Sequence, residues 1–185
     1  TFILSCGGSM GAERINEEVL VFMRDYVAKH SDIFHLHASG AIEYEAAKAK
    51  FKEYGLESVP NVQLVEYIYG MPLRMAAADL VINRAGAVTI SELALLGKPA
   101  LIIPSPNVTD NHQYKNAKVL ADAGAAVMLQ ESELAPGVFT RAVESIITDR
   151  AKMASMKENF IKFAIKNADL RIYDELKKLV NSKSV

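Results

Sequence analysis

The sequence predicts an α/β fold: a Rossmann-like parallel sheet of about six strands with helices on both faces. Two observations predict it. Short apolar runs alternate with amphipathic segments along the whole chain, which is the pattern of successive strand–helix–strand units. In addition, glycine-rich or polar stretches directly follow several of the apolar runs. In parallel sheets, the loops at the carboxyl ends of the strands carry the ligand site.

The expected strands are short and rich in Val, Ile and Leu, as is typical of strands buried on both faces. In chain order they are Phe2–Ser5, Ile33–Ala38, Val62–Val65, Leu80–Asn83, Ala100–Ile103 and Ala126–Leu129.

Helical spacing of apolar residues predicts the connecting helices. They are expected at about Ala12–Lys29, Ile42–Tyr54, Met71–Ala78, Thr89–Leu96, Gln113–Ala123 and Gly137–Thr148. A charged tail of helical period runs from about Arg150 to Val180, with Asp169 as the expected N-cap of a last helix. No repeat or linker divides the chain, so residues 1–185 are expected to form a single domain. Because the chain opens inside a strand, we expect this domain to come from a longer protein.

Composition excludes several classes of protein. The 185 residues carry a formal net charge of −1, which argues against a nucleic-acid partner bound mainly by charge. The single cysteine, Cys6, excludes a disulfide framework and a zinc cluster built on cysteines. No apolar run approaches the roughly 20 residues that span a bilayer. Neither a metal ion nor a cofactor is predicted.

The most informative stretch is Arg84–Glu92, which follows the apolar run Asp79–Asn83. It predicts a buried strand, a loop of small residues and a helix. A helix N-terminus at the carboxyl end of a parallel strand presents unpaired backbone N–H groups and the positive end of the helix dipole, which favours phosphate. The carboxylate of Glu92 would repel phosphate but suits the two hydroxyls of a ribose. The expected ligand is therefore a nucleoside diphosphate.

The first predicted turn, Gly7–Ala12, lies between a strand and a long helix. Its glycines permit positive φ and close approach of a ligand, and Ser9 adds a hydroxyl donor. The glycine spacing is not that of a dinucleotide site, which also needs an acidic residue near the end of the second strand. His37–Gly40 stand there instead. A tight turn without a ligand is the alternative interpretation.

A polar loop, Ser105–Gln113, follows the fifth predicted strand and carries amides, a hydroxyl, a carboxylate and an imidazole. Such groups match sugar hydroxyls, which need both donors and acceptors. The alternative is that Asp110 or Asn111 simply caps the next helix and that Gln113 is solvated.

His35 and His37 are two residues apart on a predicted strand and therefore share a face. A metal pair is conceivable, but no third ligand is visible, so packed histidines are the favoured interpretation. Cys6 is expected to be a small buried apolar residue. The order of residues shows neither a nucleophile elbow nor a Ser–His–Asp triad.

Three motifs occur in an order that resembles a known family. They are Gly7–Ala12 with Asn16, Asn83–Glu92, and Pro104–Pro106 leading to His112, Gln113, Asn116 and Ala117. From residue 2 to about residue 180 the chain is similar to the C-terminal half of the MurG family, the peptidoglycan N-acetylglucosaminyltransferases of the GT-B class. The resemblance implies two Rossmann-like domains that face a cleft, of which the C-terminal domain binds UDP-N-acetylglucosamine.

The resemblance further implies that the N-terminal domain, absent from this chain, binds the lipid-linked acceptor lipid I and supplies the general base. Transfer of N-acetylglucosamine then yields lipid II. The isolated chain is expected to be inactive, and no catalytic residue is assigned to it. The full-length protein is expected to be cytoplasmic and peripheral on the inner face of the bacterial membrane.

The site residues implied by the resemblance divide by the part of the donor that they meet. They are Ser9, Ala87, Val88 and Thr89 for the diphosphate, Glu92 for the ribose, the backbone of Ile68 for the uracil, and His112 and Gln113 for the sugar. Some members of the family carry a glutamine where this chain has His112.

Two other functions stay open from the sequence. The chain can be a non-catalytic nucleotide-sugar subunit that docks onto a separate acceptor subunit, or a regulatory nucleotide-binding domain without transfer chemistry.

Overall fold

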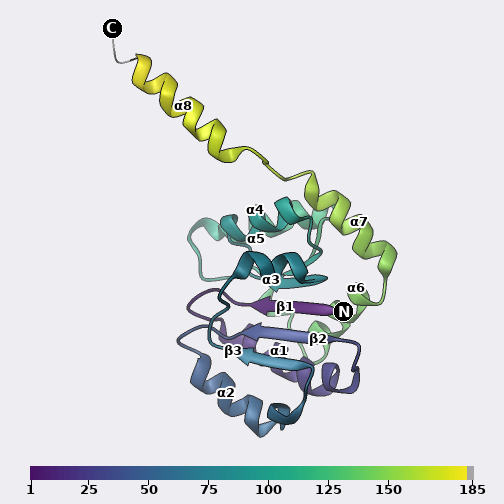
Figure 1. Ribbon diagram of the computed structural model, residues 1–185. Coiled ribbons are helices and arrows are strands. Elements are labelled where there is room, and N and C mark those ends of the chain that lie inside the picture. The colour runs from purple at the N-terminus through teal and green to yellow at the C-terminus, as the bar shows by residue number, and fades with distance from the viewer. Residues whose placement is uncertain (183–185) are drawn as a thin grey trace.

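A computed structural model describes residues 1–182 and contains one parallel sheet (Figure 1). Its strands are β1 (Phe2–Cys6), β2 (Phe34–Ala38), β3 (Val62–Val65), β4 (Leu80–Asn83), β5 (Ala100–Ile102) and β6 (Ala126–Met128). Their spatial order is β3-β2-β1-β4-β5-β6, and every neighbouring pair is parallel. Each predicted strand is confirmed to within one residue at each end.

Helices cover both faces of the sheet, as predicted. They are α1 (Glu13–Asp25), α2 (Tyr44–Glu53), α3 (Met71–Ala77), α4 (Ala87–Leu96), α5 (His112–Asp122), α6 (Val138–Ile147), α7 (Arg150–Ile161) and α8 (Ala168–Ser182). Short 3₁₀ turns lie at Val27–Lys29, Leu56–Ser58, Thr109–Asn111 and Glu131–Glu133.

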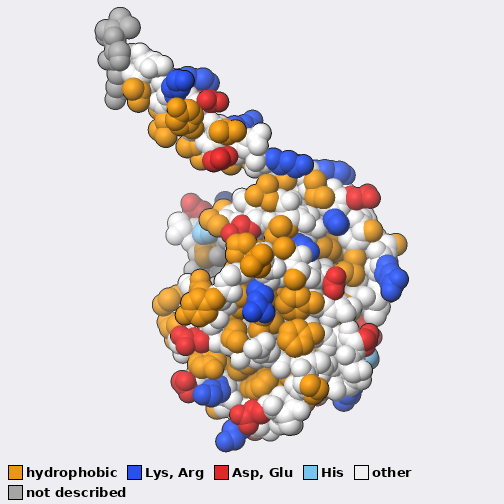
Figure 2. All heavy atoms as spheres, in the orientation of Figure 1, with side chains coloured by type: hydrophobic (Ala, Val, Ile, Leu, Met, Phe, Trp, Pro, Cys, Tyr) orange, Lys and Arg blue, Asp and Glu red, His pale blue; other side chains and the backbone are white. Residues whose placement is uncertain are grey.

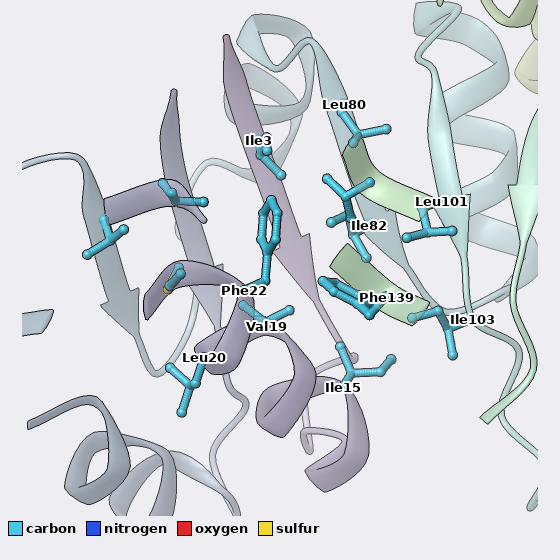
Figure 3. Close-up of a cluster of buried hydrophobic side chains, with 14 of the residues drawn as sticks. Ile3, Ile15, Val19, Leu20, Phe22, Leu80, Ile82, Leu101, Ile103 and Phe139 are labelled. Carbon is cyan, nitrogen blue, oxygen red and sulfur yellow. The ribbon is translucent and has the colours of Figure 1, made fainter. Parts of the chain in front are cut away.

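Two apolar cores lie on opposite faces of the sheet. On one face, α1 and α6 pack on the strands, with Phe22 and Phe139 in edge-to-face contact beneath Ile3 and Ile82 (Figure 3). On the other face, α3, α4 and α5 contribute the buried side chains Met75, Leu93 and Leu120 among others. Both faces of the sheet are thus buried, and the polar loops lie at the carboxyl ends of its strands.

The C-terminal tail differs from the prediction in one respect. It forms two helices, α7 and α8. Helix α7 begins at Arg150, and the carboxylate of its N-cap residue, Asp149, accepts a hydrogen bond of 2.9 Å from the Lys152 N–H. The prediction that Asp169 is the N-cap of the last helix is wrong. Helix α8 begins at Ala168, so Asp169 lies within its first turn, whereas an N-cap residue stands outside the helix.

Helix α8 extends away from the sheet and its covering helices (Figure 1). Its apolar side chains, among them Ile172 and Leu176, are more than half exposed and form an orange stripe in Figure 2. Within residues 1–182, no helix has both the length and the apolar character needed to cross a membrane.

Candidate functional site

The candidate site lies where the strand order reverses. Crossovers lead from β1 towards β2 on one side, and β4 pairs with the other side of β1. In open α/β sheets such a switch point, at the carboxyl ends of the strands, is where ligands bind. A cavity of about 270 Å³ opens there. Its walls come from the ends of four strands and from α3 and α4, and its lining includes Gly8, Ser9, Tyr67, Ile68, Thr89 and Glu92.

The loop after β1 supplies one wall. Gly8 and Gly11 have φ of +105° and +99°, so the conformational role predicted for these glycines is confirmed. A Cβ at Gly11 would lie 2.4 Å from the carbonyl oxygen of Ser39, at the end of β2. The loop therefore rests on the backbone of β2 and holds Ser9 exposed at the mouth of the cavity.

The loop after β4 supplies the opposite wall. Gly86 precedes α4 in an extended conformation, and no side chain in the described part of the chain caps this helix. Its first-turn N–H groups and the positive end of its dipole are therefore available to an anion. Thr89 lines the cavity from the first turn, and the half-buried Glu92 lines it from the second. Ala87 and Val88 are exposed at the tip of the helix.

The third wall follows β3 and is mainly apolar. Ile68 is 4% exposed, while the ring of Tyr67 is half exposed and meets the ring of Tyr69 edge-on at 5.2 Å between centroids. Met71 and Met75 continue this wall from α3. The cavity thus has a largely apolar end after β3, where Glu66 is the charged residue in the lining, and a polar end between Ser9 and Thr89. An amphiphilic ligand with an aromatic ring and an anionic group matches that division.

His112 and Gln113 lie at the same edge of the sheet, beside a second cavity after β5 that neither of them lines. This cavity of about 580 Å³ is lined by Arg14, Pro104, Ser105, Pro106, Asn111, Tyr114, Gln130, Glu131 and Ser132. Gln113 Oε1 accepts a hydrogen bond of 3.0 Å from the Ser105 N–H, and His112 Nδ1 lies 2.9 Å from the Thr109 carbonyl oxygen. Neither residue lines the switch-point cavity, so the loop that carries them is a separate part of this edge of the sheet.

The alternative interpretation of this loop holds in part, since Asn111 stands where an N-cap residue was expected. Asn111 occupies the N-cap position of α5 with φ of +50°, but its side chain makes no capping hydrogen bond to the described residues. Asp110 lies before it in the 3₁₀ turn. Gln113 is half-buried and bonded to its own loop, so it is not merely solvated.

The two histidines of β2 are packed in the core, as favoured from the sequence. Ser5 Oγ bridges them, 2.7 Å from His35 Nε2 and 2.8 Å from His37 Nδ1. Burial lowers the pKa of His37 to about 4 and that of His35 well below its ordinary value, so both rings are neutral at pH 7. Residues 1–182 contain no cluster of three or more metal-ligating side chains.

Cys6 is buried at the floor of the switch-point cavity, as expected of a small apolar residue. Burial raises the pKa of its thiol, so the thiol is protonated at neutral pH and is a poor nucleophile.

Two polar residues next to the site stand in motifs named from the sequence, which assigned neither of them a structural role. Arg84 donates to the Ile103 carbonyl oxygen at 3.2 Å and pairs with Glu131, which ties the loop before α4 to the end of β5. Asn16 is buried on α1 and contacts His37 at 2.9 Å. A signal for Asn16 was present, because it stands between Ile15 and Val19 on the apolar face of the helix.

Comparison with known proteins gives the family. The family model described as the glycosyltransferase family 28 C-terminal domain matches residues 2–172. The chain belongs to this family.

Two curated relatives of this family 28 domain carry the same name. UDP-N-acetylglucosamine–N-acetylmuramyl-(pentapeptide) pyrophosphoryl-undecaprenol N-acetylglucosamine transferases from Acetivibrio thermocellus and Flavobacterium psychrophilum are 39% and 40% identical over 96% and 98% of the chain. The crystal structure of Acinetobacter baumannii MurG is 31% identical, with a TM-score of 0.80 over 96% of this chain and 52% of that one. The chain spans about half the length of the curated relatives it matches, 47% of each.

Proposed function

We propose that this family 28 domain is the donor-binding half of a glycosyltransferase that moves N-acetylglucosamine from UDP-N-acetylglucosamine to lipid I, forming lipid II. One observation carries the proposal. Ser9, Ile68, Thr89 and Glu92, which come from three separate loops and helices, line a single cavity at the switch point. The names of the relatives supply the donor and the lipid-linked acceptor.

The cavity suggests how the nucleotide lies. The uracil would occupy the largely apolar end after β3, where the backbone of Ile68 pairs with the edge of the base. The carboxylate of Glu92 would accept hydrogen bonds from the two ribose hydroxyls. The diphosphate would then lie between Ser9 and the first turn of α4, formed by Ala87, Val88 and Thr89.

Charge develops on the diphosphate as it leaves the sugar. The N–H groups and dipole of α4 would stabilise that charge, and such fixed donors are usually the largest electrostatic contribution to catalysis. The sugar would point towards His112 and Gln113 at the neighbouring loop. This direction places the anomeric carbon at the open side of the domain, where an acceptor can approach.

The acceptor and the general base are assigned to the other half of the full-length enzyme. We propose that a preceding domain binds lipid I, closes over the donor and deprotonates the attacking hydroxyl. Such positioning supplies several kcal/mol of the barrier, and closure often sets the rate. The full-length protein would act at the cytoplasmic face of the bacterial membrane, as a peripheral enzyme.

Calorimetric titration of the chain with UDP, UDP-N-acetylglucosamine and UDP-glucose tests donor binding. We expect UDP to bind and UDP-N-acetylglucosamine to bind more tightly than UDP-glucose. Failure of UDP to bind would contradict the proposal. Equal affinity for all three ligands would instead favour a regulatory nucleotide-binding domain, since the sugar would then contribute nothing.

A transfer assay with a lipid I analogue tests whether the acceptor site and the general base belong to the preceding domain. We expect negligible transfer by residues 1–185 alone and partial activity once the preceding half of a relative is added in trans. Robust transfer by the chain alone would place the acceptor site and the base within it and would contradict the assignment.

A further inference from the structure

A chain of buried polar groups runs from the core to the loop after β1. Ser5 on β1 stands between His35 and His37 on β2, and His37 Nε2 lies 2.9 Å from Asn16 Oδ1 on α1. Asn16 Nδ2 in turn donates to the Ser39 carbonyl oxygen at 3.0 Å. All five residues are at most 4% exposed. Polar groups buried to this degree are costly unless they serve each other as partners.

The direction of every hydrogen bond follows from the last one. A carbonyl oxygen only accepts, so the amide nitrogen of Asn16 faces Ser39 and the amide oxygen faces His37. His37 therefore carries its proton on Nε2, and its bare Nδ1 accepts from the Ser5 hydroxyl at 2.8 Å. The longer contact of the same Nδ1 with the Ser5 carbonyl oxygen, at 3.2 Å, then joins two acceptors and is not a hydrogen bond. Ser5 Oγ then accepts from His35 Nε2.

The environment of His35, at the other end of this series of hydrogen bonds, agrees with the assigned donors and acceptors. With its proton on Nε2, His35 leaves Nδ1 unprotonated, and His35 Nδ1 is the buried side-chain atom that has no hydrogen-bond partner among the described residues. An unpaired acceptor of this kind costs less than an unpaired N–H would. The five groups thus form one directional chain that ends on the backbone of Ser39.

The backbone around Ser39 forms hydrogen bonds with two loops that line the cavity, the polar loop after β1 and the largely apolar loop after β3. The Ser39 and Gly40 N–H groups donate to the Val65 and Glu66 carbonyl oxygens, which lead into the β3 wall. The N–H groups of Ala41 and Ile42 donate to the carbonyl oxygens of Ser9 and Met10 in the loop after β1. A displacement of the Ser39 carbonyl would therefore move the phosphate loop and the base-binding wall together.

We propose that Asn16, oriented by His37, is a positioning residue for the nucleotide cavity: it holds the Ser39 carbonyl and through it the loops that carry Ser9 and Ile68. The inference rests on the proposed function, because the cavity is taken as the donor site. Asn16 itself does not line the cavity. It acts on the ligand through the backbone of β2.

Asn16→Asp and a matched control separate positioning from stability. Asp has the same shape, accepts from His37, and cannot donate to Ser39. Asn61→Asp is the same substitution at the opposite end of the sheet, where the amide donates to the carbonyl oxygens of Val27, His30 and Ile33. We expect both variants to unfold at a lower temperature, and only Asn16→Asp to weaken UDP binding, by about tenfold. Equal losses of affinity in the two variants, or none in Asn16→Asp, would overturn the proposal.

Nitrogen-15 NMR of the histidine rings in the unmodified chain tests the proposal without a variant. We expect the Nε2–H tautomer at pH 7 for both His35 and His37, with the His37 Nε2–H signal shifting when UDP binds. The Nδ1–H tautomer at His37 would overturn the proposal, since Asn16 could then not face Ser39 with its amide nitrogen. If UDP fails to bind the unmodified chain, the proposed function fails. Hydrogen exchange of the Ala41 and Ile42 amides then still decides whether Asn16 holds the loop. Compared with the unmodified chain, these amides should exchange faster in Asn16→Asp and at the same rate in Asn61→Asp.

Discussion

Arg84 and Glu131 form an ion pair whose side chains are only 13% and 21% exposed. Arg84 stands directly before the small-residue turn that leads into α4, and Glu131 begins the 3₁₀ turn after β6. The same guanidinium donates to the carbonyl oxygen of Ile103, at the end of β5. The pair therefore connects the loop between β4 and α4 with the loops beyond β5 and β6.

Glu131→Gln should lower the free energy of unfolding by about 1–3 kcal/mol, because it leaves a largely buried guanidinium without its counter-charge. Urea denaturation measures this. Asp122→Asn is the control, since the Lys118–Asp122 pair is well exposed and should be worth less than about 1 kcal/mol. Equal effects in the two variants would show that the Arg84 pair is no stronger than a surface contact.

Glu92→Ala should weaken UDP binding by about 1.5–3 kcal/mol, the range for hydrogen bonds to a charged group. The side chain is half-buried at the cavity, so stability should change little. Titration calorimetry compares this variant with Glu158→Ala, which removes an exposed carboxylate from α7. An unchanged dissociation constant for UDP would remove Glu92 from the ribose site.

The buried histidines predict a loss of stability in mild acid. Burial lowers the pKa of His37 from 6.5 to about 4 and that of His35 well below 6.5. Below pH 6.5 the unfolded chain binds protons that the folded chain excludes. The free energy of unfolding should therefore fall, as pH drops from 6.5 towards 5, by about 1.4 kcal/mol per pH unit for each histidine.

Urea denaturation at pH 7, 6 and 5 measures this dependence, in a range above the ordinary pKa values of carboxylates. His30→Gln is the control, because His30 lies outside the buried chain and bonds to the Tyr26 carbonyl oxygen. The control should retain the full pH dependence. A free energy of unfolding that stays constant between pH 7 and pH 5 would contradict neutral burial of His35 and His37.

Two glycines of the loop after β1 should respond differently to alanine. Both have positive φ, and a Cβ at Gly8 meets nothing within 4 Å, whereas one at Gly11 meets the Ser39 carbonyl oxygen at 2.4 Å. Gly8→Ala should cost about 1–3 kcal/mol of backbone strain. Gly11→Ala adds a steric clash of about 1–3 kcal/mol. Thermal unfolding of both variants measures the two losses of stability. A smaller loss for Gly11→Ala than for Gly8→Ala would mean that the loop does not rest on β2.

The strands and most of the switch-point cavity could be predicted from the sequence. Strands buried on both faces are continuous apolar runs, and parallel strands bring their carboxyl ends to one edge, so Ser9 and Glu92 had to lie near each other. The separate cavity beside His112 and Gln113 could not be predicted, because its shape depends on the positive φ of Asp110 and Asn111. The roles proposed for these site residues stay predictions.

The series of buried hydrogen bonds that links His35 to Ser39 could not be predicted from the sequence, for a different reason. Its hydrogen bonds join Ser5, Asn16 and His37, which are far apart along the chain and meet only once β1 and β2 pair and α1 packs across them. The sequence placed both histidines on one face of a strand and gave Asn16 only as part of a motif. It carried no information on which polar groups would become partners.

The strand order has a consequence for how specificity can change. Base contacts are expected from the loop after β3, phosphate contacts from the turns after β1 and β4, and sugar contacts from the loop after β5. The residues that pair the strands lie outside these loops. Each loop can thus change in sequence while the sheet that supports it stays the same. Replacing the β5 loop should alter the choice of sugar and leave recognition of the nucleotide intact, so one scaffold can acquire new donors by single-loop recombination.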